Sequence, residues 1–215
     1  MSIKINLNVF LFLILFLLTN QLEIYALVML FALIHELGHL LSGIILGFEA
    51  DSLKVMPLGF SIEFKTNIDN YNRKILKSNI LTLKKLFINL AGPMTNFIII
   101  LISCFMGLNE NIIYSNLIIF IINLLPIYPL DGGRILKNMF KLLVGNRKSL
   151  YYTNNISNIF AIIVTMISSI GIYYYKNIAI LFALVFIWTL IIKENKKYNI
   201  YHKIYKAIDK EKKYI

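Results

Sequence analysis

The chain has 215 residues, of which 58% are hydrophobic and 15% are charged, and its formal net charge is +11. An ordinary soluble domain is about half apolar and about a quarter charged, so this composition excludes a soluble enzyme. Several apolar runs approach the roughly 20 residues that a helix needs to span a bilayer. The composition therefore indicates an integral membrane protein with several spans.

We predict an all-α polytopic membrane protein with about six transmembrane helices. After the second helix, the segment LKVMPLGFSIEF at 53–64 alternates apolar and polar residues, which is typical of a strand. We expect a small β-hairpin or re-entrant loop there. Its edge could hold a substrate in extended form, or the hairpin could merely connect two spans. The predicted spans are 5–19, 24–48, 86–108, 112–130, 155–175 and 178–192.

Lys and Arg residues test this arrangement, because the cytoplasmic connections of membrane proteins accumulate positive charge. Alternate connections carry 21 of the 22 Lys and Arg residues, and the remaining connections carry one. This asymmetry predicts that both termini are cytoplasmic. The basic residues flank the spans instead of covering one folded face, so we expect no nucleic-acid partner.

The sequence divides into residues 1–193, which hold the predicted spans, and a charged tail at 194–215. In the tail, Tyr198, Tyr201 and Tyr205 follow one another at helical intervals, and the lysines lie mostly between them. This spacing predicts a basic amphipathic helix that binds anionic lipid of the inner leaflet. A solvated tail is the alternative.

The sequence HELGH at 35–39 lies inside the second predicted span, where ionisable side chains are expensive and need partners. His35 and His39 are one helical turn apart and share a face, so both imidazoles can reach one zinc ion. Glu36 lies beside them and could transfer protons. A catalytic zinc site uses three protein ligands and keeps one position for water, so a third ligand is required.

The candidate for the third ligand is Asp131, in the segment NLLPIYPLDGGR at 123–134. Pro126 and Pro129 should interrupt the helix, and the resulting loop could bring the carboxylate towards the second span. The alternative is that Asp131 caps a turn, because PLDGG is good turn chemistry. His202 lies in the charged tail and is expected to be a surface residue.

The combination of HELGH in one span and NLLPIYPLDGG in a later one resembles the site-2 protease family of intramembrane zinc metalloproteases. The segment NLAGPMTN at 89–96 is similar to a third element of that family, Ala-Gly-Pro-x-x-Asn. The resemblance covers residues 20–140 and is closest to a sporulation subfamily that cuts a membrane-associated sigma-factor precursor. Many relatives carry a C-terminal nucleotide-sensing domain, which about 22 residues after the last span cannot form.

Together with the motifs, the resemblance implies one zinc ion per chain, held by His35, His39 and Asp131, with Glu36 as the catalytic base. It also implies a substrate contact for Asn123, for which an interhelical polar contact is the alternative. The expected partners are a membrane-associated protein substrate, namely a sigma-factor precursor or an anti-sigma factor, and membrane proteins that inhibit or activate cleavage.

Two other functions fit the same residues. A membrane metal carrier or sensor would bind a metal in transit, and a non-catalytic scaffold would only retain the fold. Neither function requires Glu36. Replacing Glu36 with Gln separates these hypotheses from a protease, because metal binding should survive the change and cleavage should not.

Overall fold

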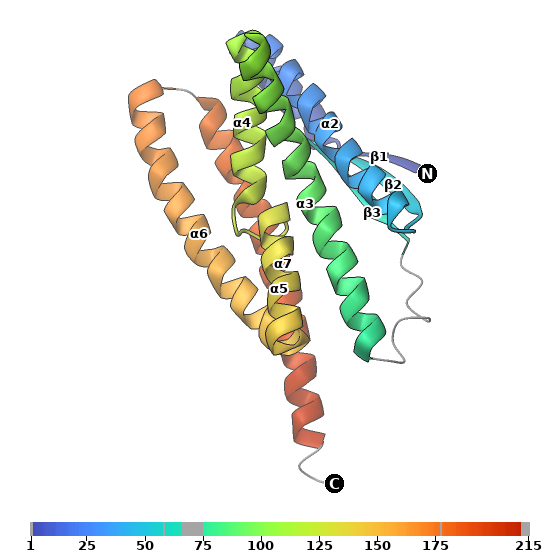
Figure 1. The fold of residues 1–215 in the computed structure, drawn as a ribbon. Coiled ribbons are helices and arrows are strands. Elements are labelled where there is room, and N and C mark those ends of the chain that lie inside the picture. Colours follow the sequence, from blue (N-terminus) through green and yellow to red (C-terminus); the bar gives the residue numbers. More distant parts are fainter. Residues whose placement is uncertain (1, 58, 66–74, 177, 212–215) are drawn as a thin grey trace. The chain divides into compact units, whose positions relative to one another are not determined.

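The computed structural model describes residues 2–57, 59–65, 75–176 and 178–211 (Figure 1). The chain forms two compact units, Met1–Leu125 and Pro126–Ile215. Over the described residues, the first unit holds a three-stranded sheet and four helices, and the second unit holds three helices. The predicted helical fold with a small β-structure after the second helix is therefore confirmed in outline.

Apolar runs of the sequence form the helices of the first unit, and the alternating segment between two of these runs forms strands. The elements are β1 (Ser2–Ile5), α1 (Asn8–Leu18), α2 (Leu22–Ile45), β2 (Ala50–Met56), β3 (Gly59–Phe64), α3 (Ile75–Met106) and α4 (Glu110–Leu124). Pro93 lies inside α3 without ending it.

The sheet has the order β1-β2-β3. β2 and β3 pair antiparallel, with Leu53 opposite Ile62, and form the hairpin that the alternation predicts. β1 adds to β2 as a parallel strand, with Ile3 opposite Leu53. β1 was not predicted, and the first predicted span begins at residue 5, inside the strand. A parallel partner far along the chain leaves no local turn signal by which such a strand could be recognised.

The core of the first unit lies against the helix that carries HELGH. Phe31 and Ala32 of α2 pack with Ile119 of α4. Half-buried Ile99 of α3 and Phe60 of β3 pack against this cluster. The contacts therefore hold α2 against α3, α4 and the sheet.

The second unit begins where prolines separate two helices. α4 ends at Leu124 and the next helix begins at Asp131, so the interruption predicted from Pro126 and Pro129 is confirmed. The first helix of this unit was not predicted, because its segment was interpreted only as a charged connection. The elements are α5 (Asp131–Val144), α6 (Asn146–Tyr175) and α7 (Ile178–Glu211).

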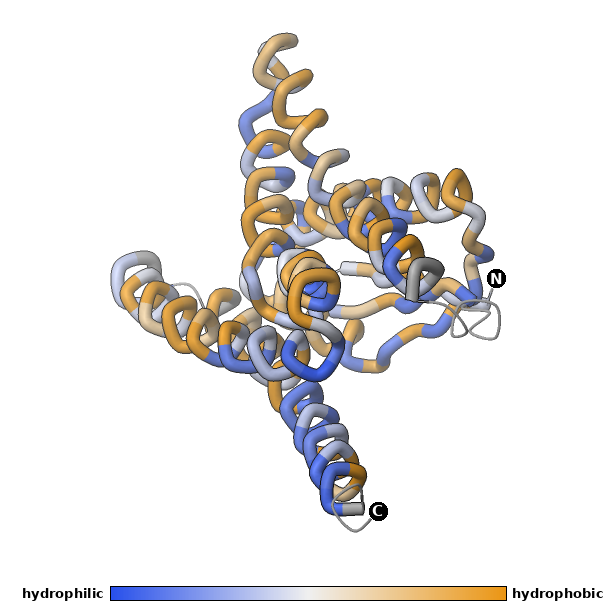
Figure 2. Tube along the Cα trace, turned by 60° about the horizontal axis from the view of Figure 1, so that its bottom comes forward, coloured by the Kyte–Doolittle hydropathy of each residue, from blue (hydrophilic) through white to orange (hydrophobic). Residues whose placement is uncertain are grey.

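α7 continues through the predicted domain boundary at residue 193, so the last apolar run and the basic tail form one helix. Towards its end, Asp209 pairs with Arg147 of α6 at 2.6 Å. The Arg147 guanidinium also lies 5.5 Å from the ring centroid of Tyr205. The C-terminal part of α7 is largely hydrophilic (Figure 2). Lipid binding by the tail and the domain boundary both stay predictions.

Several helices have the properties of membrane segments. Large apolar side chains are exposed on them, with Phe105 at 94% and Ile45 at 82% exposure. Such surfaces suit lipid and not water. α1 and α4 are apolar but shorter than a typical span. Among the described residues, three helical segments are long and apolar enough to cross a membrane: Leu22–Ile45, Ser78–Met106 and Asn146–Tyr174. These features support a membrane protein, while the six spans stay a prediction.

Candidate metal centre and active site

His35 and His39 lie on one face of α2, with only 3% and 4% of their surfaces exposed. A spacing of four residues places them one helical turn apart, as the sequence predicts. Their ring centroids are 4.8 Å apart. Two polar rings buried in apolar surroundings are costly unless their nitrogens have partners.

A carbonyl oxygen orients each imidazole through its Nδ1 atom. His35 Nδ1 lies 2.5 Å from Oδ1 of Asn96, and His39 Nδ1 lies 2.6 Å from the backbone oxygen of Ile88. A carbonyl oxygen only accepts, so each Nδ1 carries a proton and donates it. The Gly92 N–H also approaches His39 Nδ1, but at the longer distance of 3.3 Å. In the neutral ring Nε2 is then the acceptor, which is the tautomer of metal-binding histidines.

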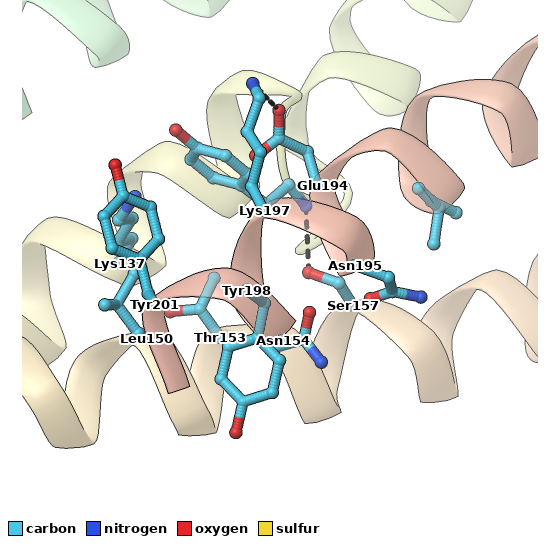
Figure 3. Close-up of a pocket in the computed structure, with 12 residues that line it drawn as sticks. Lys137, Leu150, Thr153, Asn154, Ser157, Glu194, Asn195, Lys197, Tyr198 and Tyr201 are labelled. Carbon is cyan, nitrogen blue, oxygen red and sulfur yellow. Dashed lines mark hydrogen bonds and ion pairs between the residues drawn. The ribbon is translucent and has the colours of Figure 1, made fainter. Parts of the chain in front are cut away.

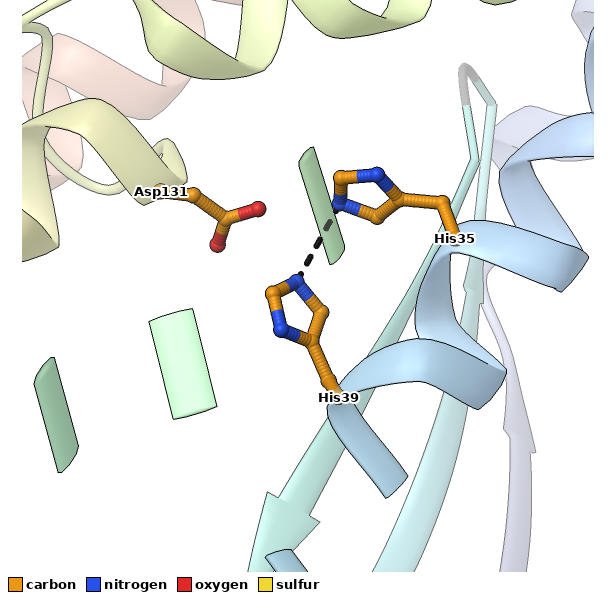
Figure 4. Close-up of side chains that lie close together, drawn as sticks. All are labelled: His35, His39 and Asp131. Carbon is orange, nitrogen blue, oxygen red and sulfur yellow. Dashed lines mark hydrogen bonds between the residues drawn. The ribbon is translucent and has the colours of Figure 1, made fainter. Parts of the chain in front are cut away.

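The two Nε2 atoms converge at a distance of 3.2 Å (Figure 4). Two nitrogens bound to a tetrahedral zinc ion at its usual bond length are separated by roughly 3.3 Å. The spacing of the histidine pair therefore fits zinc.

Two buried amide side chains form a hydrogen-bonded chain that holds the Nδ1 side of the His35 ring. Asn96 of α3 donates from Nδ2 to Oδ1 of Asn116 in α4 at 2.8 Å, and Asn116 donates to the backbone oxygen of Ile112 at 2.8 Å. Both amide side chains have 0% exposure. Asn116 was not predicted as a residue of the site. Its signal was a single amide in the middle of an apolar run.

Gly92 of α3 lies directly against the histidine pair. A Cβ atom at this position would collide with Nε2 of His39 and would lie 2.6 Å from Nε2 of His35. Any side chain would therefore enter the space between the two nitrogens. The glycine of NLAGPMTN is required by this close approach and not by an unusual backbone conformation.

Glu36 follows His35 on α2 and is half-buried. Its Oε2 accepts a hydrogen bond of 3.0 Å from the backbone N–H of Ile62 in β3. The sheet is thus bonded to the helix that carries both histidines. No pattern in the sequence indicated this contact.

Asp131 lies in the second unit as the first residue of α5, and its exposure is 5%. Nη1 of Arg134 lies 3.7 Å from its Oδ1. A Cβ atom at Gly133 would collide with the backbone N of Tyr128, so the turn before α5 closes tightly only with glycine there. The sequence PLDGG thereby places a buried carboxylate at a helix N-terminus, where the helix dipole favours negative charge. Figure 4 also draws this side chain.

The structure brings the two predicted histidine ligands together, and the role of Asp131 as the third ligand stays a prediction. Asn123 is half-buried near the end of α4, and its substrate contact also stays a prediction. His202 is exposed and stacks on Tyr198 with ring centroids 5.8 Å apart. His202 therefore lies on the surface, as expected.

A cavity of about 50 Å³ lies within the second unit (Figure 3). Thr153 of α6 lines it. Among the buried side-chain nitrogen and oxygen atoms of the described residues, only Thr153 Oγ1 has no hydrogen-bond partner. Glu194 and Lys197 of α7 also line the cavity and form an ion pair of 2.6 Å. This hydrogen bond raises the pKa of Lys197. A cavity of this size can hold a few water molecules.

Comparison with known protein families matches residues 108–167 to Peptidase family M50. The matched segment contains the whole of α4, the proline-containing turn and Asp131. It does not include HELGH at 35–39. The histidine pair is therefore an indication of a metal-dependent peptidase that is independent of this match.

Two curated relatives are similar to the chain over most of its length. Stage IV sporulation protein FB of Bacillus subtilis (strain 168) is 29% identical over 149 residues, which are 64% of this chain and 48% of that protein. A zinc metalloprotease of Methanocaldococcus jannaschii is 30% identical over 144 residues, which are 62% of this chain and 39% of that protein. The chain thus covers less than half of either relative.

The fold is also similar to a solved structure. The site-2 protease from Methanocaldococcus jannaschii superposes with a TM-score of 0.65, and the match covers 89% of each chain at 22% sequence identity. A likeness at this identity shows the fold. The family match and the two relatives agree with this fold. The chain matches Peptidase family M50 over residues 108–167 and has the fold of a site-2 protease.

Proposed function

We propose that the chain is an intramembrane zinc metalloprotease that hydrolyses a peptide bond in or near a membrane segment of a regulatory protein. The observation that carries this proposal is the buried pair of Nε2 atoms 3.2 Å apart, a spacing that fits a zinc ion. The similarity to known proteins supports the same conclusion, because one relative is a zinc metalloprotease.

His35, His39 and Asp131 would hold one zinc ion through two imidazole nitrogens and a carboxylate oxygen, a donor set that suits catalytic zinc. All three side chains are buried. When bound, the ion lowers the pKa of its water to about 7 and polarises a carbonyl group. The three side chains would thereby fix the place of hydrolysis within the protein.

Glu36 would act as the general base. Its carboxylate would accept a proton from the attacking water and later donate that proton to the leaving amine nitrogen. Glu36 suits this role because it is adjacent to His35 and its Oε2 is oriented by the Ile62 N–H. Asn123 would donate a hydrogen bond to the substrate or to the tetrahedral intermediate.

The substrate would bind in extended form along the edge of β3. Pairing with a strand edge uses main-chain hydrogen bonds and keeps the peptide unwound. The proposed substrate is a membrane-associated sigma-factor precursor, because one relative is a sporulation protein. An anti-sigma factor or another membrane regulator is the second candidate, and membrane proteins that inhibit or activate cleavage are proposed partners.

The test compares two glutamates of the same helix. Glu36→Gln removes the proposed base, whereas Glu23→Gln changes an exposed residue in the first turn of α2. Each protein is purified in detergent, its bound zinc is measured, and a single-span sigma-factor precursor is added. We expect one zinc ion in wild type and both variants, and a kcat lowered about 10²–10⁴-fold in Glu36→Gln alone.

Cleavage by Glu36→Gln at the wild-type rate would overturn the assignment of the base. Bound zinc without cleavage of precursor or anti-sigma factor by the wild type would favour the metal-carrier hypothesis. Absence of zinc from the wild type would overturn the metal site itself.

A further inference from the structure

β3 runs alongside α2 from one end to the other. At one end, a Cβ atom at Gly59 would lie 3.5 Å from the Cβ of Ala32, and at the other end a Cβ atom at Gly43 would collide with the ring of Phe64. Glycine at position 43 therefore allows the strand and the helix to approach closely, whereas a Cβ atom at Gly59 would make an ordinary van der Waals contact. The close contacts define where each residue of β3 lies along α2.

The lengths of the two segments match. From Ala32 to Gly43 the helix rises roughly 16 Å, and from Gly59 to Phe64 the strand also rises roughly 16 Å. The strand and the helix therefore cover the same distance between the two contacts. Ile62 and Glu36 lie between these ends, so packing at both ends sets the distance across which they meet.

Ile62 directs its N–H away from the rest of the sheet. β3 is an edge strand of the described sheet, and its partner strand is β2. The N–H of Ile62 donates to Oε2 of Glu36 at 3.0 Å. Backbone N–H groups of a strand point towards one neighbour or the other, so an N–H bonded to Glu36 belongs to the free edge.

We propose that the backbone N–H of Ile62 positions the carboxylate of Glu36 for catalysis and is therefore unavailable to a substrate strand. This inference rests on the proposed function, in which Glu36 is the general base. The hydrogen bond on Oε2 fixes the rotation of the carboxylate group. A substrate that pairs with the edge of β3 would have to use other residues of that edge.

The first experiment tests the hydrogen bond without requiring activity. Carbonyl-¹³C serine and ¹⁵N isoleucine label three Ser-Ile pairs, at 2–3, 61–62 and 169–170. In metal-free protein, the spectrum should contain the Ile62 amide, which Ile62→Val identifies by its loss. We expect hydrogen exchange of this amide to become about 10- to 100-fold faster in Glu36→Ala. The amides of Ile3 and Ile170 should not change.

The second experiment separates positioning from substrate binding. Ile62→Pro removes both the N–H and the buried side chain, whereas Ile62→Ala removes only the side chain. Proline is tolerated on an edge strand where the N–H faces outwards. We expect kcat of Ile62→Pro to be about 10- to 100-fold below that of Ile62→Ala, with the same KM and the same zinc content.

A backbone ester in place of the amide at Ile62 provides a third variant if the proline prevents folding, since it removes only the N–H. Equal kcat values for Ile62→Pro, Ile62→Ala and the ester would overturn the inference, as would unchanged exchange of the Ile62 amide in Glu36→Ala. A higher KM with unchanged kcat would show that this N–H binds substrate instead. Failure of the proposed function would appear separately, as full cleavage by Glu36→Gln.

Discussion

At the scale of single residues, the histidine pair depends on groups outside HELGH. Asn96 and the backbone of Ile88 hold the two Nδ1 atoms, and Gly92 leaves space between the two Nε2 atoms. All three belong to α3 and lie in or next to the segment NLAGPMTN. This segment therefore shapes the metal centre without supplying a ligand.

Gly92→Ala should abolish zinc binding. The added Cβ would occupy the space between the two Nε2 atoms and would displace both rings. The control is Gly171→Ala in α6, where the nearest atom to a new Cβ is 3.9 Å away. Zinc content after purification measures the effect. Stoichiometric zinc in Gly92→Ala would show that the rings accommodate the methyl group.

Asn96→Ala should weaken zinc binding by about 10- to 100-fold, because removal of a group that orients a ligating histidine has this effect in other zinc sites. Asn158→Ala serves as the control, since it removes a partly buried amide contact to Asn195 in the second unit. Competition with a chelator measures the zinc affinity. Equal affinities in the two variants would contradict an orienting role for Asn96.

The residues of the metal centre were predictable only in part. The spacing of His35 and His39 is a local property, and helix geometry alone places them on one face. Asn116 and Ile62 act through contacts with distant parts of the chain, and one of them contributes only its backbone. Sequence spacing carries no information about which backbone N–H reaches a carboxylate, so Ile62 could not be found.

At the scale of elements, polar side chains of α6 and α7 line the cavity of the second unit. The Thr153 hydroxyl is buried at the cavity without a hydrogen-bond partner. A buried polar group left unpaired costs about 1–3 kcal/mol. This cost offsets part of the stability that packing of the two helices provides.

Thr153→Val should therefore raise the free energy of unfolding by about 1 kcal/mol, because valine has nearly the same shape and no hydroxyl to pair. Thr82→Val is the opposite control, since the buried Thr82 hydroxyl donates to the backbone oxygen of Ser78 at 2.8 Å. That variant should be less stable than the wild type. Thermal unfolding in detergent compares both. A less stable Thr153→Val would mean that an ordered water pairs with the hydroxyl.

Elements with strong local signals were predicted more successfully than elements defined by distant partners. The apolar runs predicted the helices, and the alternation after α2 predicted the hairpin of β2 and β3. β1 has four residues and pairs with a strand far along the chain, so its pattern is too short to recognise. α5 is amphipathic, but its segment was interpreted as a charged connection between two spans and not as a helix.

At the scale of the whole molecule, the distribution of Lys and Arg is the strongest indication of how the chain is oriented in the membrane. Alternate connections carry 21 of the 22 Lys and Arg residues. In the described part of the chain, three helices are long enough to span a bilayer, and they do not by themselves determine the number of crossings. The six-span arrangement with cytoplasmic termini is therefore a hypothesis that labelling can test.

Single cysteines in a Cys104→Ser background should report opposite sides of the membrane. Glu110→Cys lies in a connection expected outside the cytoplasm, and Lys65→Cys lies in a basic connection expected inside. An impermeant maleimide should label Glu110→Cys in intact cells and Lys65→Cys only after permeabilisation. Labelling of both, or the reverse pattern, would contradict the six-span arrangement.

The parallel pairing of β1 with β2 has a consequence for the order of assembly. Ser2 lies opposite Ser52, so 50 residues separate synthesis of the two partners. At ordinary elongation rates this interval is roughly 3–10 s. α1 and α2 are synthesised during this interval, before the partner strand of β1 exists. A nascent chain that has just completed β2 already contains both histidines, but it lacks the backbone amide that orients Glu36.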